Sequence, residues 1–402
     1  MSRPLRVTSA RVWDGQAAVE RQLFTTDVVL ASPPDDAQTI ALDGLTIYPG
    51  LINAHDHLEL NHYPRSVFRA RYDNAHQWGE EVSAQLEKTP YRELRAYPLV
   101  DRLFIGGLKN LLSGALTVVQ HNPPHASLFS RDFPVRVLGR YGWAHSLHFS
   151  KRADLLASRA DAGDAPWFIH IAEGTDAVAA AEYAQLDGLG CARPNTVIIH
   201  GVGLSADDLR RAAKTVRGLV TCPSTNVRLL GRTVNLKAWL ANGGKAAIGS
   251  DSRLTADGDL LDELHAAREA FPSLETRLPA LVLEDAARLI GLPERGHLRP
   301  GAPADWFALP SGLSILDAKR ADLALVVRGG IPQIGDPALM ARFSDRPSVP
   351  ALLDGVPKAI YAPLAAQIAA CALKEPRLTL LGEPPRRRRL TFLSGRQARD
   401  GG

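Results

Sequence analysis

The stretch that decides the fold is LTIYPGLINAHDHLEL, residues 45–60, in which an apolar run ends at His55, Asp56 and His57. A nearly continuous apolar run is typical of a strand that is buried on both faces, as in a parallel sheet covered by helices. Residues two apart in a strand point to the same face, so His55 and His57 project together and Asp56 projects the other way. Two imidazoles side by side where a buried strand ends form half of a metal site.

This run is the first of seven apolar segments that alternate with helix-like segments along the chain. The segments are 46–54, 115–120, 135–140, 167–172, 196–200, 218–222 and 245–250. Strands that alternate with helices predict a parallel sheet covered by helices, and this number of strands in about 200 residues predicts a closed barrel. The predicted fold class is therefore α/β, with a TIM-like (β/α)8 barrel.

The two ends of the chain have a different sequence pattern, typical of short strands and turns. Strand-like runs with Asp-Gly turns occupy residues 5–49, and similar runs return after residue 296. The N-terminal strands lack a core of their own, so we expect them to pair with the C-terminal strands. The predicted division is a β domain from 1–49 and 297–402 around a barrel from 50–296, with a late helix over 363–373.

Composition excludes several classes of protein. The 402 residues are 45% hydrophobic and 22% charged with a net charge of +4, too weakly basic to predict nucleic-acid binding. No run reaches the about 18 apolar residues of a membrane span. Three separated cysteines fit a reducing compartment, so a cytoplasmic protein is expected. The one dense basic run, Arg386–Arg389, is interpreted as a solvated tail whose role stays open, and nucleic-acid binding through it is a rival interpretation.

The other apolar segments end in residues of the same chemical kind as the first. His170 lies in WFIHIAEG with Glu173 three residues later, His200 ends TVIIH, and Asp251 follows AAIGS. The carboxyl ends of barrel strands carry the chemistry of such folds, so these side chains are expected to meet at one end of the barrel. Burying that many ionisable groups without partners would cost several kcal/mol each, so a metal site is predicted.

The order of these motifs resembles the amidohydrolase superfamily. PGLINAHDH, IHIAEG, VIIHG, CPSTN and GSDS follow one another as they do in the branch that holds cytosine deaminase, guanine deaminase and the triazine hydrolases. The resemblance runs from about residue 5 to about residue 336, and it includes LVLEDAARLIGL and GHLRPGAPADW.

The resemblance implies a role for each of these residues. The implied metal ligands are His55, His57, His170 and Asp251. Among the implied catalytic residues, Glu173 is the proton shuttle, His200 orients the attacking water or polarises the substrate, and Asp251 accepts the proton of that water. No strand end offers a lysine of the kind that binuclear members carbamylate, so one divalent ion, zinc or iron, is expected.

The implied function is a metal-dependent aminohydrolase, a deaminase that acts on a small N-heterocycle. Ring-opening hydrolysis of a cyclic amide such as an imidazolone is the alternative, because HxxE occurs in members of both kinds. A catalytically inactive barrel used for binding is a further alternative. The expected partner is a small-molecule substrate, with no nucleic acid and no membrane. Homodimers are common in the family, so a homodimer is compatible with the resemblance.

Substrate contacts are expected from the long aromatic loop after His57 and from other strand ends. The candidates are Asn61, Tyr63, Trp78, His121, His125 and Asn226. The alternative for the aromatic residues is that they only pack the loop onto the barrel.

The span between His121 and His170 is short for this family. It offers one clear strand, 135–140, and one clear helix, RADLLASRADAG, while WAHSLHF is left open as a residual or merged strand. A barrel with one degenerate strand is therefore an expected variant of the fold.

Overall fold

The apolar run at residues 45–60 divides between two sheets at Gly50. In the computed structural model, which describes residues 3–384, β7 (Leu45–Pro49) pairs antiparallel with β16 (Trp306–Pro310). β8 (Leu51–Asp56) instead pairs parallel with β9 (Ala115–Gln120). A Cβ at Gly50 would lie 2.9 Å from the Leu116 side chain, so glycine fits where the chain passes from one sheet to the other. The single strand predicted over 46–54 is thus two strands.

The barrel strands run parallel and in chain order. β8, β9 and β10 (Arg136–Val137) form one sheet, and five strands form the next: β11 (Gly142–Ser146), β12 (Trp167–Ile171), β13 (Thr196–His200), β14 (Gly218–Thr221) and β15 (Ala246–Ile248). The last strand returns to the first, because the Asp251 N–H donates to the His55 carbonyl at 3.0 Å. Apolar side chains from these strands form a buried cluster that includes Ile52, Phe168 and Val220. The TIM-like barrel predicted from the sequence is confirmed.

One barrel strand is degenerate, as the short span predicts. β10 keeps only two residues of the strand predicted over 135–140 and pairs with β9. β11 pairs with β12, and only residues 138–141 separate it from β10, so no helix lies between them. The segment WAHSLHF therefore does contribute a strand, and the predicted helix RADLLASRADAG is α4 (Arg152–Asp161).

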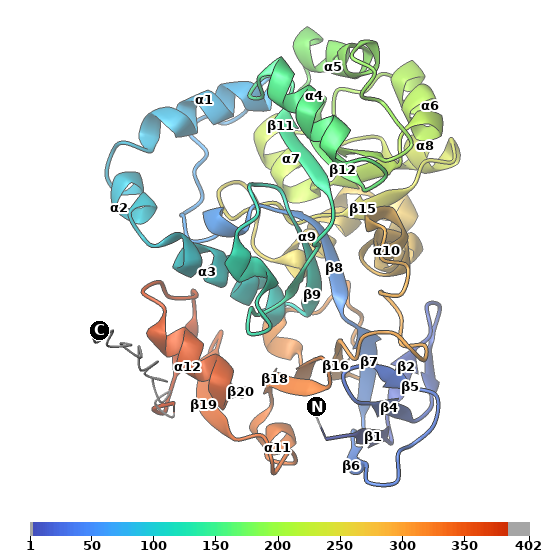
Figure 1. Ribbon diagram of the computed structural model, residues 1–402, viewed down its shortest axis with the longest axis vertical. Coiled ribbons are helices and arrows are strands. Elements are labelled where there is room, and N and C mark those ends of the chain that lie inside the picture. Colours follow the sequence, from blue (N-terminus) through green and yellow to red (C-terminus); the bar gives the residue numbers. More distant parts are fainter. Residues whose placement is uncertain (1–2, 385–402) are drawn as a thin grey trace, which may run out of the picture.

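Helices cover the barrel strands, as Figure 1 shows in its upper part. They are α3 (Leu99–Leu112), α4, α5 (Ala177–Gly188), α6 (Ala206–Thr215), α7 (Pro223–Leu230), α8 (Leu236–Ala241), α9 (Leu260–Ala270) and α10 (Glu284–Ile290). Two further helices, α1 (Ala75–Gln85) and α2 (Tyr91–Arg95), belong to the long segment between β8 and α3 and lie at the left in Figure 1. The 3-10 helices are η1 (Leu58–Leu60), η2 (Ala126–Phe129), η3 (Pro272–Val282) and η4 (Arg320–Asp322). Ser205 caps α6 by accepting the Asp208 N–H, because serine can satisfy an otherwise unpaired donor of the first turn.

Strands from the two ends of the chain share one sheet below the barrel in Figure 1. Its order is β21 (Leu378–Leu380), β19 (Ser348–Leu353), β20 (Val356–Tyr361), β18 (Ile331–Gly335), β17 (Leu325–Arg328), β16, β7, β2 (Arg11–Trp13) and β3 (Ala18–Glu20). A second sheet has the order β5 (Val29–Leu30), β4 (Leu23–Thr25), β1 (Leu5–Thr8) and β6 (Gln38–Ala41). α11 (Pro337–Met340) and α12 (Ala362–Ala370) complete this part, and α12 is the late helix that the sequence predicts.

The two ends also share a hydrophobic core. Leu5 and Ile40 belong to the same buried cluster as Trp306 and Leu325. The composite β domain is therefore confirmed as an arrangement of strands. The boundaries 1–49, 50–296 and 297–402 stay a prediction, which the pairing of β7 with β16 supports.

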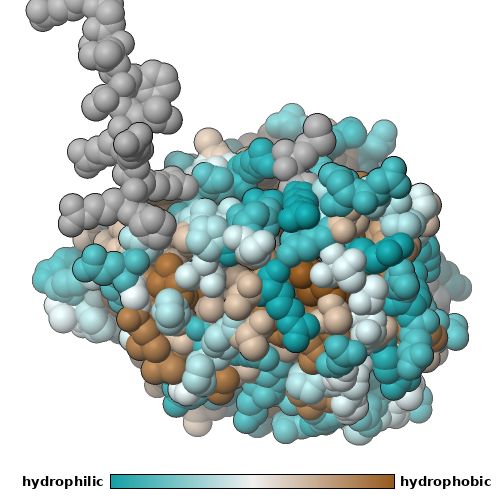
Figure 2. Space-filling view, turned by 90° about the horizontal axis from the view of Figure 1, so that it is seen from below, coloured by the Kyte–Doolittle hydropathy of each residue, from teal (hydrophilic) through white to brown (hydrophobic). Residues whose placement is uncertain are grey.

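The surface seen from below carries hydrophobic side chains in small groups among hydrophilic ones (Figure 2). None of the helices described between residues 3 and 384 is both long and apolar enough to cross a membrane. Cys191, Cys222 and Cys371 are buried and free. The basic run Arg386–Arg389 lies outside the described residues.

Candidate metal centre

Four side chains predicted as metal ligands meet at the carboxyl ends of three barrel strands. His55 lies in β8 and His57 directly follows that strand, His170 lies in β12, and Asp251 follows β15. The Nε2 atoms of His55 and His170 are 3.2 Å apart. Asp251 Oδ1 lies 3.9 Å from His55 Nε2 and 3.8 Å from His57 Nε2. All four residues are buried.

His121 adds a further imidazole to this cluster. It directly follows β9, and its ligand atom lies within 4.8 Å of those of His55 and His170. Its Nε2 lies 3.0 Å from the Ala144 carbonyl, which can only accept, so Nε2 carries the proton and Nδ1 keeps its lone pair. A histidine that donates one ring N–H to a carbonyl while its other nitrogen is free is arranged as metal ligands are. The sequence predicted His121 as a substrate contact, and the structure makes it equally a candidate ligand.

The donor set fits a divalent cation. His55, His57 and His170 bring Nε2 atoms that face Asp251 or one another, and Nδ1 of His121 is buried without a hydrogen-bond partner within residues 3–384. Burial, followed by the neighbouring imidazoles, holds the pKa of His55 and His170 well below the usual value. The rings are therefore neutral and present lone pairs, which zinc and other first-row divalent ions accept.

His200 and Glu173 face each other beside this cluster. His200 Nδ1 donates to Asn226 Oδ1 at 2.8 Å, which leaves Nε2 directed at Glu173 Oε1, 3.5 Å away. Burial, and then the charge of Asp251, raises the pKa of Glu173 well above its usual value. A raised pKa favours the protonated form of a carboxyl group, which can deliver its proton to a substrate.

The backbone at three strand ends adopts a conformation that residues other than glycine rarely take. Ala172, His200 and Asp251 have φ of 57°, 70° and 55°, in the left-handed region. Such conformations cost on the order of 1–3 kcal/mol each and persist where surrounding contacts hold them. They turn His200 and Asp251 toward the cluster at the point where each strand stops.

A buried polar network lies beneath the cluster, on the face to which Asp56 points. Lys109 of α3 pairs with Asp56 Oδ2 at 2.9 Å, and both side chains are fully buried. Lys109 Nζ also donates to Ser250 Oγ and to the Asp251 carbonyl. Asp56 accepts further hydrogen bonds from the amides of Asn61, Asn110 and Asn53. The network therefore ties β8, α3 and the end of β15 together under the candidate ligands.

Sequence reasoning missed this network and the nearness of His145. Lys109 and Asn110 lie in the middle of a helix, where no motif distinguishes them from other polar residues. His145 of β11 has its ring 4.9 Å from that of His170, but its strand is too polar to be recognised as buried. Asn61, predicted as a substrate contact, has its amide group engaged with Asp56.

The remaining predicted substrate contacts lie at different places. Tyr63 packs in a cluster with Val82, and Trp78 donates to the Ser66 carbonyl, so both hold the loop after His57 together. His125 caps the short helix η2 and accepts the Ser127 N–H. Asn226 contacts His200, as given above, so it orients the ring.

Comparison with known proteins supports the assignment of the fold and the branch. Over 199 residues the chain is 30% identical to 8-oxoguanine deaminase of Pseudomonas aeruginosa, covering 42% of this chain and 43% of that protein. Over 110 residues it is 33% identical to aminodeoxyfutalosine deaminase of Deinococcus radiodurans, covering 26% of each. The chain thus spans less than half of the length of these relatives. No family model matches the chain.

Solved structures share the fold across most of the chain. An adenosine deaminase from Xanthomonas campestris with bound zinc superposes with a TM-score of 0.64 at 18% identity, covering 83% of this chain and 92% of that one. Triazine hydrolase from Arthrobacter aurescens gives a TM-score of 0.67 at 18% identity, covering 84% and 96%. The strand-end motifs and the deaminase relatives support the resemblance of the chain to the amidohydrolase superfamily, and the solved structures show that the fold is shared.

Proposed function

We propose that this protein is a metal-dependent aminohydrolase that removes ammonia from an N-heterocycle. The observation that carries the proposal is the pairing of Glu173 with His200 beside a buried cluster of imidazoles and one carboxylate. A protonated carboxyl group, a fixed imidazole and a metal-binding donor set are the parts that hydrolytic deamination needs.

In this proposal His55, His57, His170 and Asp251 hold one divalent ion, with His121 as a further candidate ligand. When bound, such an ion lowers the pKa of a coordinated water from about 15.7 toward about 7. Zinc is favoured over iron by the zinc in the adenosine deaminase that shares the fold.

The chain's own residues supply the proton transfers. Glu173 gives a proton to a ring nitrogen of the substrate, which makes the adjacent carbon more electrophilic. Asp251 accepts one proton of the attacking water. Glu173, now a carboxylate, takes up the proton of the hydroxyl group added to the carbon as the carbonyl forms and delivers it to the leaving amine, and the proton held by Asp251 then returns Glu173 to its protonated form. His200, fixed by Asn226 through its Nδ1 N–H, keeps a lone pair on Nε2, with which it accepts a hydrogen bond from the attacking water and orients that water.

An aminopurine-like heterocycle is the substrate class that the relatives' names favour. 8-Oxoguanine deaminase and 5-methylthioadenosine/S-adenosylhomocysteine deaminase are both named for purine substrates. The protein is further proposed to act on a free small molecule, as a monomer or as a homodimer.

Ammonia release from a panel of aminopurines, pterins, pyrimidines and aminotriazines tests the proposal. We expect release from one class by the zinc-loaded protein, abolished in Glu173→Gln, with full activity retained in the control Glu80→Gln. Hydrolysis of a cyclic amide without ammonia release would contradict the deaminase and select the ring-opening alternative. Bound metal with no turnover on either panel would instead favour the inactive barrel.

A further inference from the structure

A cavity of about 990 Å³ lies between the barrel and the composite β domain, away from the histidine cluster. Among residues 3–384, five arginines line it, namely Arg131, Arg136, Arg295, Arg328 and Arg346, together with two aspartates, Asp27 and Asp132. None of the residues that line the cavity belongs to the candidate metal centre. A volume of this size accommodates a nucleotide-sized ligand.

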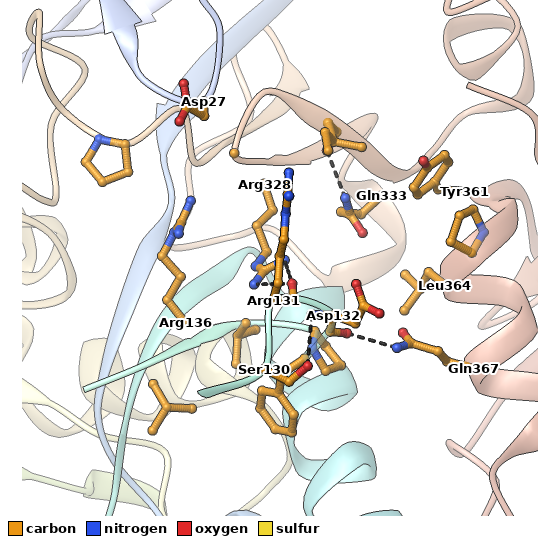
Figure 3. Close-up of a pocket in the computed structure, with 18 of the residues that line it drawn as sticks. Asp27, Ser130, Arg131, Asp132, Arg136, Arg328, Gln333, Tyr361, Leu364 and Gln367 are labelled. Atoms are coloured by element: carbon orange, nitrogen blue, oxygen red, sulfur yellow. Dashed lines mark hydrogen bonds between the residues drawn. The ribbon is translucent and has the colours of Figure 1, made fainter. Parts of the chain in front are cut away.

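The cavity exists because the chain is short between β9 and β11. In this span only the 3-10 helix η2 and the two-residue strand β10 are formed, so residues 128–137 line one side of an open space. The other sides come from the C-terminal strands and from α12. In Figure 3, Arg131 and Arg328 lie together near the centre and Arg136 lies on the side of Asp27.

Arg328 has unused hydrogen-bonding capacity. Its two terminal nitrogens both donate to the Arg131 carbonyl at 3.2 Å, a neutral acceptor. Its Nε is buried and has no hydrogen-bond partner among the described residues. Burial, followed by the nearby Arg136, lowers the pKa of Arg328 below its usual value. A cation in these surroundings is stabilised by any anion that enters the cavity.

The other arginines leave the cavity positively charged. Arg136 is the best compensated, because it makes two hydrogen bonds to Asp305, at 2.6 and 3.2 Å. Among the described residues, Arg295 and Arg346 form ion pairs only with their own sequence neighbours, at 3.7 and 3.5 Å, and Arg295 also donates to Thr117 Oγ1 at 2.7 Å. Guanidinium groups grouped in this way match phosphate oxygens, to which they donate in pairs.

The opposite side of the cavity is less polar. Tyr361, Leu364 and Gln367 lie there in Figure 3, and Phe129 and Phe133 also line the space. Aromatic and amide groups of this kind contact a flat organic group better than a bare ion. Guanidinium groups and aromatic surface within one cavity indicate a ligand with both characters.

We propose that this cavity is a second ligand site, which binds a polyphosphate group carried by a nucleotide or by an inorganic phosphate chain. The site is separate from the proposed deaminase centre and does not depend on it. Arg131 and Arg328 are its central phosphate contacts. The aromatic groups favour a nucleotide as the carrier of the polyphosphate group. Titration with inorganic pyrophosphate distinguishes a nucleotide from an inorganic phosphate chain.

Calorimetric titration of the metal-loaded protein with ATP, GTP, pyrophosphate and adenosine tests this site. We expect the nucleotides to bind with an affinity that falls as salt is raised. Arg131→Gln and Arg328→Gln should each weaken binding about tenfold or more, since each removes charged hydrogen bonds. The control Arg140→Gln, an exposed arginine outside the cavity, should bind as the wild type does.

The variants separate the proposal from its rivals. Arg131 is exposed, so Arg131→Gln keeps the fold even if Arg328→Gln does not. Binding that survives both substitutions would show that the phosphates contact the metal centre instead, and it would overturn the site. Equal binding of adenosine and ATP, or no binding of either nucleotide or pyrophosphate, would overturn it as well. Binding of pyrophosphate without binding of ATP or GTP would support the site and identify its ligand as an inorganic phosphate chain.

Discussion

Replacement of Lys109 by methionine should destabilise the protein by about 3 kcal/mol, at the lower end of the about 3–5 kcal/mol that loss of one partner from a buried ion pair costs. The substitution leaves the Asp56 carboxylate fully buried without its ammonium partner 2.9 Å away. The lower end applies because Asp56 keeps hydrogen bonds from the amides of Asn61, Asn110 and Asn53, at 2.8, 2.7 and 3.2 Å.

A double-mutant cycle isolates the contribution of the pair. Asp56→Asn alone leaves the buried ammonium of Lys109 without a charged partner. Lys109→Met combined with Asp56→Asn leaves no unpaired charge. The double variant should therefore cost about 1–3 kcal/mol less than the sum of the two single variants. The control Lys245→Met changes an exposed lysine and should fall within about 0.5 kcal/mol of the wild type.

The assay is urea unfolding followed by circular dichroism at equal metal loading, with metal content measured on each variant. Because Lys109 also donates to the Asp251 carbonyl, we expect Lys109→Met to weaken metal binding as well. Two results would refute the claim that this pair stabilises the base of the site. One is a change in unfolding free energy in the double variant equal to the sum of the two single changes, and the other is an unchanged unfolding midpoint in Lys109→Met.

Three further predictions concern the groups around the cluster. His121→Ala should lower metal affinity measured by competition with a chelator, because it removes a free imidazole nitrogen beside His55; unchanged affinity would return His121 to a substrate role. Asn226→Leu should lower kcat about tenfold or more with little change in metal content, because His200 loses the acceptor that fixes its ring; a wild-type kcat would exclude that positioning role. Glu263, whose pKa burial raises to about 8 from 4.5, accepts the Ser224 N–H at the start of α7. The stabilisation linked to its neutral form is complete below pH 4.5 and is lost progressively as pH rises from there through about 8, so Glu263→Gln should match the wild type in Tm near pH 4 and exceed it by a margin that grows toward pH 9; parallel Tm curves would contradict this assignment.

The strand ends were predictable from the sequence because their geometry is local. Alternation in a strand places His55 and His57 on one face, and the carboxyl ends of parallel strands meet, so His170 and Asp251 follow from their positions alone. The same alternation sent Asp56 to the opposite face, where the structure places it.

The remainder depends on packing that no local pattern encodes. Lys109 reaches the base of the site from the middle of a helix, and its partner follows only from how α3 packs on β8. The division of the apolar run at Gly50 is invisible in hydropathy, because both halves are equally buried. The arginine cavity draws its residues from segments about 340 positions apart in the chain, such as Asp27 and Gln367, so only the assembled fold reveals it.

Metal content of the freshly purified protein tests the central claim most directly. We expect about one zinc or iron ion per chain, lost in His55→Ala and in Asp251→Ala while the circular dichroism spectrum is kept. Wild-type protein that binds neither zinc nor iron, even after incubation with each, would contradict the claim that these strand ends form a metal centre.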